Sequence, residues 1–275
     1  MASIGPTAHY TAQVWSRNGL SHPELDTLEG RVLHAVTAPT MLASRLLGGP
    51  TLDAALLGRH LAIDALLGEA IASGRVGQVV EVACGMSPRG WRFTEAHSDL
   101  VYIEADLPDM AARKRAALAR IGRPDRHRVV DLDALAAGGP LSLSAVTSEL
   151  DPAKGLAIIT EGLLSYLPHD AVLDLWSRFA AAIARFPDGV YLSDLHVHSD
   201  TPGLLTRAFA DALSAFVRSR VAVHFADEHE ARAALLNAGF AEADVRRASE
   251  HAAASDLKGA DRVRIVRALG APTAS

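Results

Sequence analysis

The alternation of short β-branched runs with longer helical patterns after residue 78 most constrains how this chain folds. Candidate strands lie at 78–83, 100–104, 127–131, 156–160, 189–193, 241–247 and 262–268. Candidate helices lie between them at 108–121, 142–150, 169–186, 202–219 and 228–238. This alternation predicts an α/β fold in which crossover connections build a mostly parallel sheet with helices on both faces. The last two strands lack an intervening helix, so we expect a terminal antiparallel hairpin at one edge.

Helical signals dominate before residue 78. Apolar residues repeat every three or four positions from Thr51 to Ile71, and Gly74 follows, which predicts an amphipathic helix. In residues 1–50, Pro23, Pro39 and Pro50 interrupt the apolar stretches, so we expect short helices packed against something larger. The predicted division is an N-terminal helical cap segment, 1–50, and a single main domain, 51–275.

Composition narrows the class of partner. With 49% hydrophobic residues and a formal charge of −5, the chain has an ordinary globular balance and no global basic field for nucleic acid or an anionic membrane. One basic cluster, 113–128, is read as a solvated helix face rather than a nucleic-acid site. The single cysteine, Cys84, and the lack of a signal peptide or an apolar run of membrane-spanning length predict a soluble, cytoplasmic protein with small-molecule partners.

The exit of the first strand is the first place to expect a ligand, because open α/β sheets bind ligands at the carboxyl ends of their strands. It reads Ala83-Cys84-Gly85, and these small residues allow close approach to the backbone. A dinucleotide fingerprint would need glycine where Ala83 and Pro88 stand, so a nicotinamide-dependent oxidoreductase is disfavoured. A tight turn without a ligand remains the alternative.

Acidic residues follow three further strands. Glu104 or Asp106 could accept hydrogen bonds from ribose hydroxyls, or Asp106 could cap the next helix. Asp131 could accept a hydrogen bond from the amino group of an adenine, or it could be a turn residue. Glu161 ends a strand that should be covered on both faces, so it needs a partner, either a ligand amine or a neighbouring arginine.

Together these segments resemble class I S-adenosylmethionine-dependent methyltransferases, specifically the leucine carboxyl methyltransferase family with its polyketide-type O-methyltransferase relatives. The matching pieces are Glu81–Gly85 with Arg89 and Arg92, then Glu104–Pro108, Asp131-Leu132 and Glu161–Tyr166. The resemblance implies a Rossmann-like seven-stranded sheet, S-adenosylmethionine as cofactor and no metal ion. Two departures stand out: Ala83 replaces the family's first glycine, and Ser87 replaces an aspartate whose role is not carried over.

The resemblance also implies residue roles. Arg59 looks like the arginine that pairs with the methionine carboxylate, and Glu161 like the glutamate that complements the ammonium group. The other cofactor residues implied are Glu81 and Gly85 at the first strand, Asp106 on the ribose with Glu104 as its substitute, and Asp131 and Leu132 beside the adenine. The segment Thr7–Asn18 sits where the family has a lid, although surface packing would explain it equally.

Tyr166, His196 and His198 are the candidates for acceptor contact or general base, with solvated loop residues as the alternative for the histidines. Arg89 and Arg92 could hold an acidic substrate or form salt bridges at a helix start. The predicted function is O-methylation of a carboxylate or hydroxyl on a small, natural-product-like molecule. The alternative is a non-catalytic, cofactor-binding regulatory or scaffolding protein. The acceptor's identity and the oligomeric state, a homodimer included, are left open.

Overall fold

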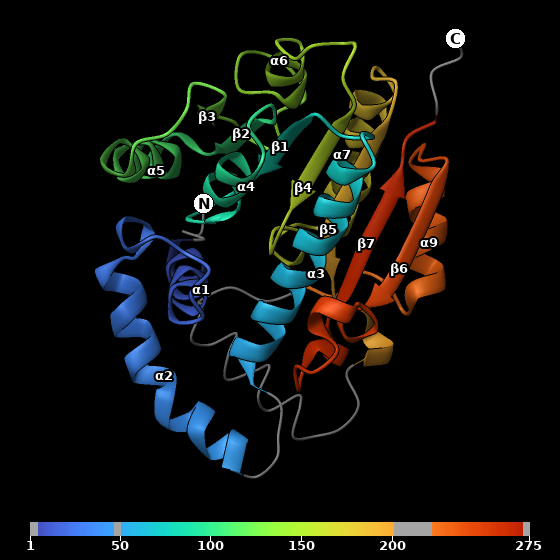
Figure 1. Ribbon diagram of the computed structural model, residues 1–275. Helices are drawn as coiled ribbons and strands as arrows, with labels where there is room; N and C mark the ends of the chain where they lie inside the picture. Colours follow the sequence, from blue (N-terminus) through green and yellow to red (C-terminus); the bar gives the residue numbers. More distant parts are fainter. Residues whose placement is uncertain (1–4, 47–50, 201–221, 272–275) are drawn as a thin grey trace.

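The computed structural model describes residues 5–46, 51–200 and 222–271, and it shows one seven-stranded sheet (Figure 1). The strands are β1 (Gln78–Val82), β2 (Val101–Asp106), β3 (His127–Asp131), β4 (Leu156–Thr160), β5 (Gly189–Leu195), β6 (Glu242–Arg247) and β7 (Arg264–Leu269). Their order across the sheet is β3-β2-β1-β4-β5-β7-β6. The first five are parallel, and β7 runs antiparallel to both β5 and β6. The predicted mostly parallel sheet with an antiparallel end hairpin is confirmed.

The helices are α1 (Gly5–Arg17), α2 (Leu28–Leu46), α3 (Leu52–Ala72), α4 (Arg89–Ala96), α5 (Pro108–Ile121), α6 (Leu143–Thr147), α7 (His169–Ile183) and α9 (Glu228–Asn237). Four of the five helices predicted between the strands are present as α5, α6, α7 and α9, and the one predicted at 202–219 lies outside the described residues. The helix α4 was not predicted. It is short and polar, Gly90 is its second residue, and no side chain caps its start, so it lacks the usual signals of a helix.

Two hydrophobic layers hold the helices on the sheet. On one face, Val79, Tyr102 and Ile159 pack with Ile63 and Leu67 of α3 and with Phe93 of α4. On the other face, Val80, Ile103 and Ile158 pack with Trp176 and Phe179 of α7 and with residues of α6 and α9. The alternation along each strand follows from the two-residue period of β structure, and both faces are buried because helices cover both (Figure 1).

The N-terminal helices differ from the prediction of short, proline-interrupted pieces. Helix α2 runs 19 residues and continues through Pro39. Proline removes the donor for the carbonyl of Ala35, but Ala35 is exposed, so water can satisfy that carbonyl and the helix persists. Gly30 lets α2 cross close to α1, because a side chain there would collide with the backbone of His9.

Helix α1 lies at the carboxyl end of the parallel strands, on the side toward which β4 points (Figure 1). Its Trp15 packs with Met86, which follows β1, and with Ala111 and Leu118 of α5. None of the helices within the described ranges is long and apolar enough to cross a bilayer. The division of the chain at residue 50 stays a prediction.

Candidate active site

The loop that follows β1 has the backbone conformation of a ligand-binding turn. Ala83 has a φ of 56° and Gly85 a φ of 51°, so two residues of this loop occupy the left-handed region. Alanine pays a steric cost there that glycine avoids, so the loop keeps a glycine-type shape although Ala83 replaces the usual glycine. A side chain on Gly85 would approach Ala8 of α1 to 3.2 Å, so α1 packs directly against this loop.

Asp106, at the end of β2, faces the same loop. Its Oδ2 accepts a hydrogen bond from the backbone N–H of Gly85 at 2.7 Å, and its Oδ1 accepts one from Leu107 at 2.8 Å. Burial raises the pKa of this carboxyl, although the two backbone donors oppose the shift. Pro108 begins α5 directly after Leu107, and the Asp106 side chain bonds Leu107 rather than a later residue of the helix. Asp106 therefore links the end of β2 to the loop of β1.

Glu104, the other candidate for the ribose, lies deeper. It is fully buried, Lys114 Nζ lies 2.7 Å from its Oε1, and His127 Nε2 lies 3.0 Å from its Oε2. Burial opposes its ionisation, but the charge of Lys114 and the hydrogen bond from His127 hold the pKa of Glu104 below its usual value. Both oxygens thus face protein partners, which leaves Asp106 as the acid nearer the loop.

Asp131 and Leu132 follow β3 beside Asp106. In the sheet register Asp131 pairs with Asp106, and the N–H of Leu132 donates to the Asp106 carbonyl at 2.8 Å. The Asp131 side chain is part-exposed and forms an ion pair with Arg115 at 2.8 Å. The structure thus brings the two segments expected at the nucleoside end together.

Arg59 of α3 bridges the ends of β4 and β5. Its Nε donates to Glu161 Oε1 and its Nη1 to Asp194 Oδ2, each at 3.0 Å. Although burial opposes charging, Asp194 and Glu161 raise the pKa of this guanidinium. Among the described residues, none bonds its Nη2. The backbone N–H of Gly162 donates to Asp194 Oδ1 at 2.6 Å and closes this arrangement.

Glu161 was predicted to pair with either a ligand amine or a neighbouring arginine, and the structure shows arginine partners. Besides Arg59, its Oε2 lies 2.9 Å from His60 Nδ1 and 2.5 Å from Arg89 Nη2. Burial favours the protonated acid, yet His60 and the two arginines hold the pKa of Glu161 well below its usual value. A buried carboxylate surrounded by cationic groups stays ionised, so Glu161 acts as a fixed negative charge at this edge.

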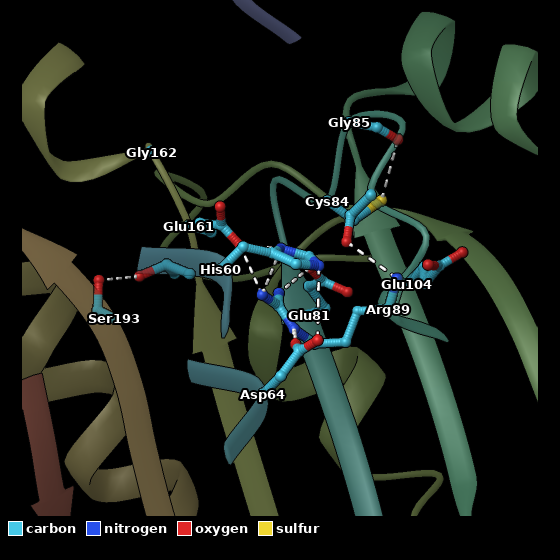
Figure 2. Close-up of polar contacts among 12 residues, drawn as sticks. His60, Asp64, Glu81, Cys84, Gly85, Arg89, Glu104, Glu161, Gly162 and Ser193 are labelled. Atoms are coloured by element: carbon cyan, nitrogen blue, oxygen red, sulfur yellow. Dashed lines mark hydrogen bonds and ion pairs between the residues drawn. The ribbon is translucent and has the colours of Figure 1, made fainter. Parts of the chain in front are cut away.

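Arg89 sits at the centre of a buried cluster that Figure 2 shows. Its Nε donates to Asp64 Oδ1 and its Nη1 to Glu81 Oε1, both at 2.6 Å, while its Nη2 reaches Glu161. Glu81 also accepts a hydrogen bond from the hydroxyl of Tyr102 at 2.8 Å. We call Arg89, His60 and the three carboxylates the Arg89 cluster. Arg89 is fully buried, so the salt-bridge reading of this arginine holds and it is closed to an acidic substrate.

The basic cluster at 113–128 was predicted to be a solvated helix face, and Lys114 departs from that prediction. This residue is fully buried, with an ion pair to Glu104 and a hydrogen bond from its Nζ to the carbonyl of Ser87 at 2.6 Å. Although burial opposes charging, the nearby acids raise the pKa of Lys114. The prediction of a solvated face is wrong there, because an acid on the neighbouring strand made burial of the ammonium favourable. Arg115, Arg120 and Arg128 pair with acids at the surface.

The three candidate acceptor residues lie at different depths. Tyr166 is half-buried, in the 3₁₀ turn Leu164–Tyr166 after Glu161, and interacts electrostatically with Arg59. His196 follows β5, its Nδ1 lies 3.2 Å from the carbonyl of Arg262, and burial lowers its pKa. His198 is exposed, and its backbone N–H donates to the carbonyl of Phe225.

Asp194 and Gly162 belong to this site, and neither was among the site residues predicted from the sequence. Gly162 has a φ of 73°, and a side chain on it would approach Arg59 Nη2 to 3.0 Å. The signals that could have found them are a carboxylate inside the apolar strand β5 and a glycine directly after a strand-ending glutamate.

The fold and the edge site define the class of Rossmann-like methyltransferases. The family model described as leucine carboxyl methyltransferase matches residues 24–180, more than half of the chain. The chain belongs to the leucine carboxyl methyltransferase family, which confirms the resemblance seen in the sequence.

Individual relatives agree with this class. A protein of Mycolicibacterium gilvum named "Putative S-adenosyl-L-methionine-dependent methyltransferase" is 34% identical over 126 residues, which cover 44% of this chain and 40% of that relative. The chain therefore matches about two fifths of that relative's length. The expected cofactor agrees with the relative's name.

Solved structures share the fold across nearly the whole chain. A "putative methyltransferase" from Thermobifida fusca has a TM-score of 0.67 at 14% identity and covers 97% of this chain and 94% of its own. A DUF574 family protein from Streptomyces avermitilis has a TM-score of 0.66 at 11% identity and covers 98% and 100%. At these identities the likeness shows the fold alone.

Proposed function

We propose that this protein is an S-adenosylmethionine-dependent O-methyltransferase that acts on a carboxylate or hydroxyl oxygen of a small, natural-product-like molecule. The observation that carries the proposal is the arrangement of groups at one sheet edge. Asp106 is hydrogen-bonded to the glycine-type loop, and Arg59 is fixed by Glu161 and Asp194 with its Nη2 unused within the described residues. Family membership supports this reading of the edge.

The groups at this edge fit the two ends of the cofactor. Each carboxylate oxygen has two lone pairs and Asp106 uses one on each, so both oxygens can still accept from ribose hydroxyls. Arg59 Nη2 can donate to the methionine carboxylate, and the fixed charge of Glu161 complements the ammonium group. Gly85 leaves the loop without a side chain, and Asp131 and Leu132 are assigned to the adenine side.

Bound S-adenosylmethionine supplies a methyl group on a sulfonium leaving group. The chain's task is then to hold the acceptor oxygen in line and to exclude water, and we assign Tyr166 and α1 to this task. A carboxylate acceptor is already ionised near neutral pH and needs no base. A hydroxyl acceptor needs one. His196 fits that role, because burial favours its neutral form and donation from Nδ1 to the Arg262 carbonyl would leave Nε2 as the proton acceptor. His198 stays a candidate for acceptor contact.

Calorimetry with S-adenosylhomocysteine, followed by transfer of labelled methyl to a panel of carboxylic acids and phenols, tests the proposal. The wild-type protein should bind the product and label at least one acceptor. Asp106→Asn should weaken binding roughly 10-fold or more, since it removes a charged hydrogen-bond acceptor. Arg128→Gln, at an exposed ion pair with Glu149, should leave it unchanged. Absence of binding would overturn the proposal. Tight binding without turnover of any acceptor would instead favour the regulatory or scaffolding alternative.

A further inference from the structure

We propose that Arg89 is a positioning residue for the amino-acid end of the cofactor, acting through Glu161 on Arg59. The inference rests on the function proposed above and assigns Arg89 a role that its fully buried side chain could not have by direct contact.

Arg89 joins three separate elements. Its guanidinium contacts Asp64 on α3, Glu81 on β1 and Glu161 after β4, at 2.5–2.6 Å. The planar fork of arginine can serve three carboxylates in three directions, which the point charge of a lysine cannot. Arg89 is also the first residue of α4, directly after the loop of β1. One side chain therefore fixes the helix that carries Arg59, the strand that leads into the loop, and the acid that orients Arg59.

Glu161 passes this constraint to Arg59. Its Oε2 is held by Arg89 and His60, and its Oε1 accepts from Arg59 Nε. If Oε2 lost its anchor, the carboxylate could rotate and the Arg59 fork would turn with it. Arg59 Nη2, the nitrogen proposed to meet the methionine carboxylate, would then leave its position. Asp194 would hold only the Nη1 side.

The consequence is selective for one end of the ligand. The nucleoside end is assigned to Asp106 and Asp131, and neither residue contacts the Arg89 cluster directly: Asp106 bonds the backbone at 85 and 107, and Asp131 pairs with Arg115. Loss of Arg89 should therefore weaken a ligand that has the amino-acid part and spare one that lacks it.

The test compares two ligands on three proteins by calorimetry. S-adenosylhomocysteine has the amino-acid end, and methylthioadenosine has only the nucleoside end. Arg89→Lys should weaken S-adenosylhomocysteine roughly 10-fold or more and methylthioadenosine less than about 3-fold. Tyr102→Phe is the matched control: it removes a buried hydrogen bond to Glu81 and leaves Glu161 untouched, so both affinities should stay at wild-type values.

A purely structural role for Arg89 predicts a different pattern. It would weaken both ligands together, or the loss of affinity would follow the loss in thermal midpoint in the same proportion for Tyr102→Phe and Arg89→Lys. Either result overturns the proposal. If Arg89→Lys does not fold, His60→Gln removes the second anchor of Glu161 Oε2 and should show the same selectivity. Wild-type protein that binds neither ligand would contradict the proposed function itself.

Discussion

At the scale of single residues, the site needs a glycine whose missing side chain leaves room for the Arg59 guanidinium, in addition to its charged groups. Gly162 has a φ of 73°, and Arg59 Nη2 would lie 3.0 Å from a Cβ placed there. Gly74, just after the end of α3, has nearly the same φ of 72° but nothing within 4 Å of such a Cβ. The two glycines separate the cost of the backbone conformation from the effect on the site.

Gly162→Ala and Gly74→Ala should each lower the free energy of unfolding by about 1 kcal/mol, since alanine in the left-handed region costs that order of energy. Only Gly162→Ala should also weaken S-adenosylhomocysteine, because its methyl group displaces the Arg59 guanidinium. Urea denaturation and calorimetry measure the two effects. Equal ligand affinity in the two variants would contradict the assignment of Gly162 to the site.

Residue roles were only partly predictable from the sequence. Glu161 was predicted to need a partner because its carboxylate ends an apolar strand. Its partners come from α3 and α4, which are remote in the sequence, so the sequence could not identify them. Glu104 and Asp106 are two positions apart and looked equivalent. Lys114 and His127 distinguish them, because they surround Glu104 and leave Asp106 beside the loop.

At the scale of elements, the loop after β1 keeps a strained residue at its start. Ala83 is the one non-glycine residue with positive φ among the described residues. Its left-handed conformation costs about 1–2 kcal/mol, which a glycine at this position would relieve. Glycine also makes the unfolded chain more flexible, and this cancels about 0.4–1 kcal/mol of that gain.

Ala83→Gly should therefore raise the free energy of unfolding by about 0.5–1 kcal/mol, measured by urea denaturation. Ala116→Gly, at an exposed position inside α5, is the control and should lower it by about 1 kcal/mol, because glycine is unfavourable within a helix. A drop in stability for Ala83→Gly would show that the loop does not hold the left-handed conformation in solution.

Element boundaries were well predicted where patterning is local. The strands β3 and β4 and the helix α5 begin and end at the predicted residues. Helix α4 was not predicted, because buried ion pairs rather than a local pattern stabilise it. Helix α2 was expected to break, but it continues through Pro39 because water can satisfy the carbonyl that the proline leaves without a donor. Neither support is visible in a local pattern.

At the scale of the whole molecule, buried ionisable groups tie stability to pH. Burial opposes ionisation of Asp64, Glu104 and Glu161, yet neighbouring cations hold the pKa of each below its usual value. Burial lowers the pKa of His9, His196 and His251 below 6.5. In both groups the unfolded chain binds protons first as the pH falls, so the free energy of unfolding must decrease toward acid. Asp106, whose pKa burial raises, opposes the trend.

The urea midpoint should be level between about pH 7 and pH 8, fall from about pH 6.5 as the histidines titrate in the unfolded chain, and fall more steeply below about pH 4.5 as the carboxyls do. His196→Gln should reduce the first part of the fall and leave the second. A midpoint that rises or stays level as the pH falls from about 4.5 to about 3 would contradict the buried ionised cluster.

By itself, the sequence determined the α/β class, the parallel sheet with its closing hairpin, and the edge at which acidic residues gather, because strand alternation and strand-ending polar residues are local patterns. Only the tertiary structure decided which charges meet. The guanidinium of Arg89 lies 2.5–2.6 Å from carboxylate oxygens of Asp64, Glu81 and Glu161. These four residues lie on different elements, and only the folded sheet brings them together. A buried charge is tolerated only where opposite charges surround it, so its role follows from its neighbours in space rather than in sequence.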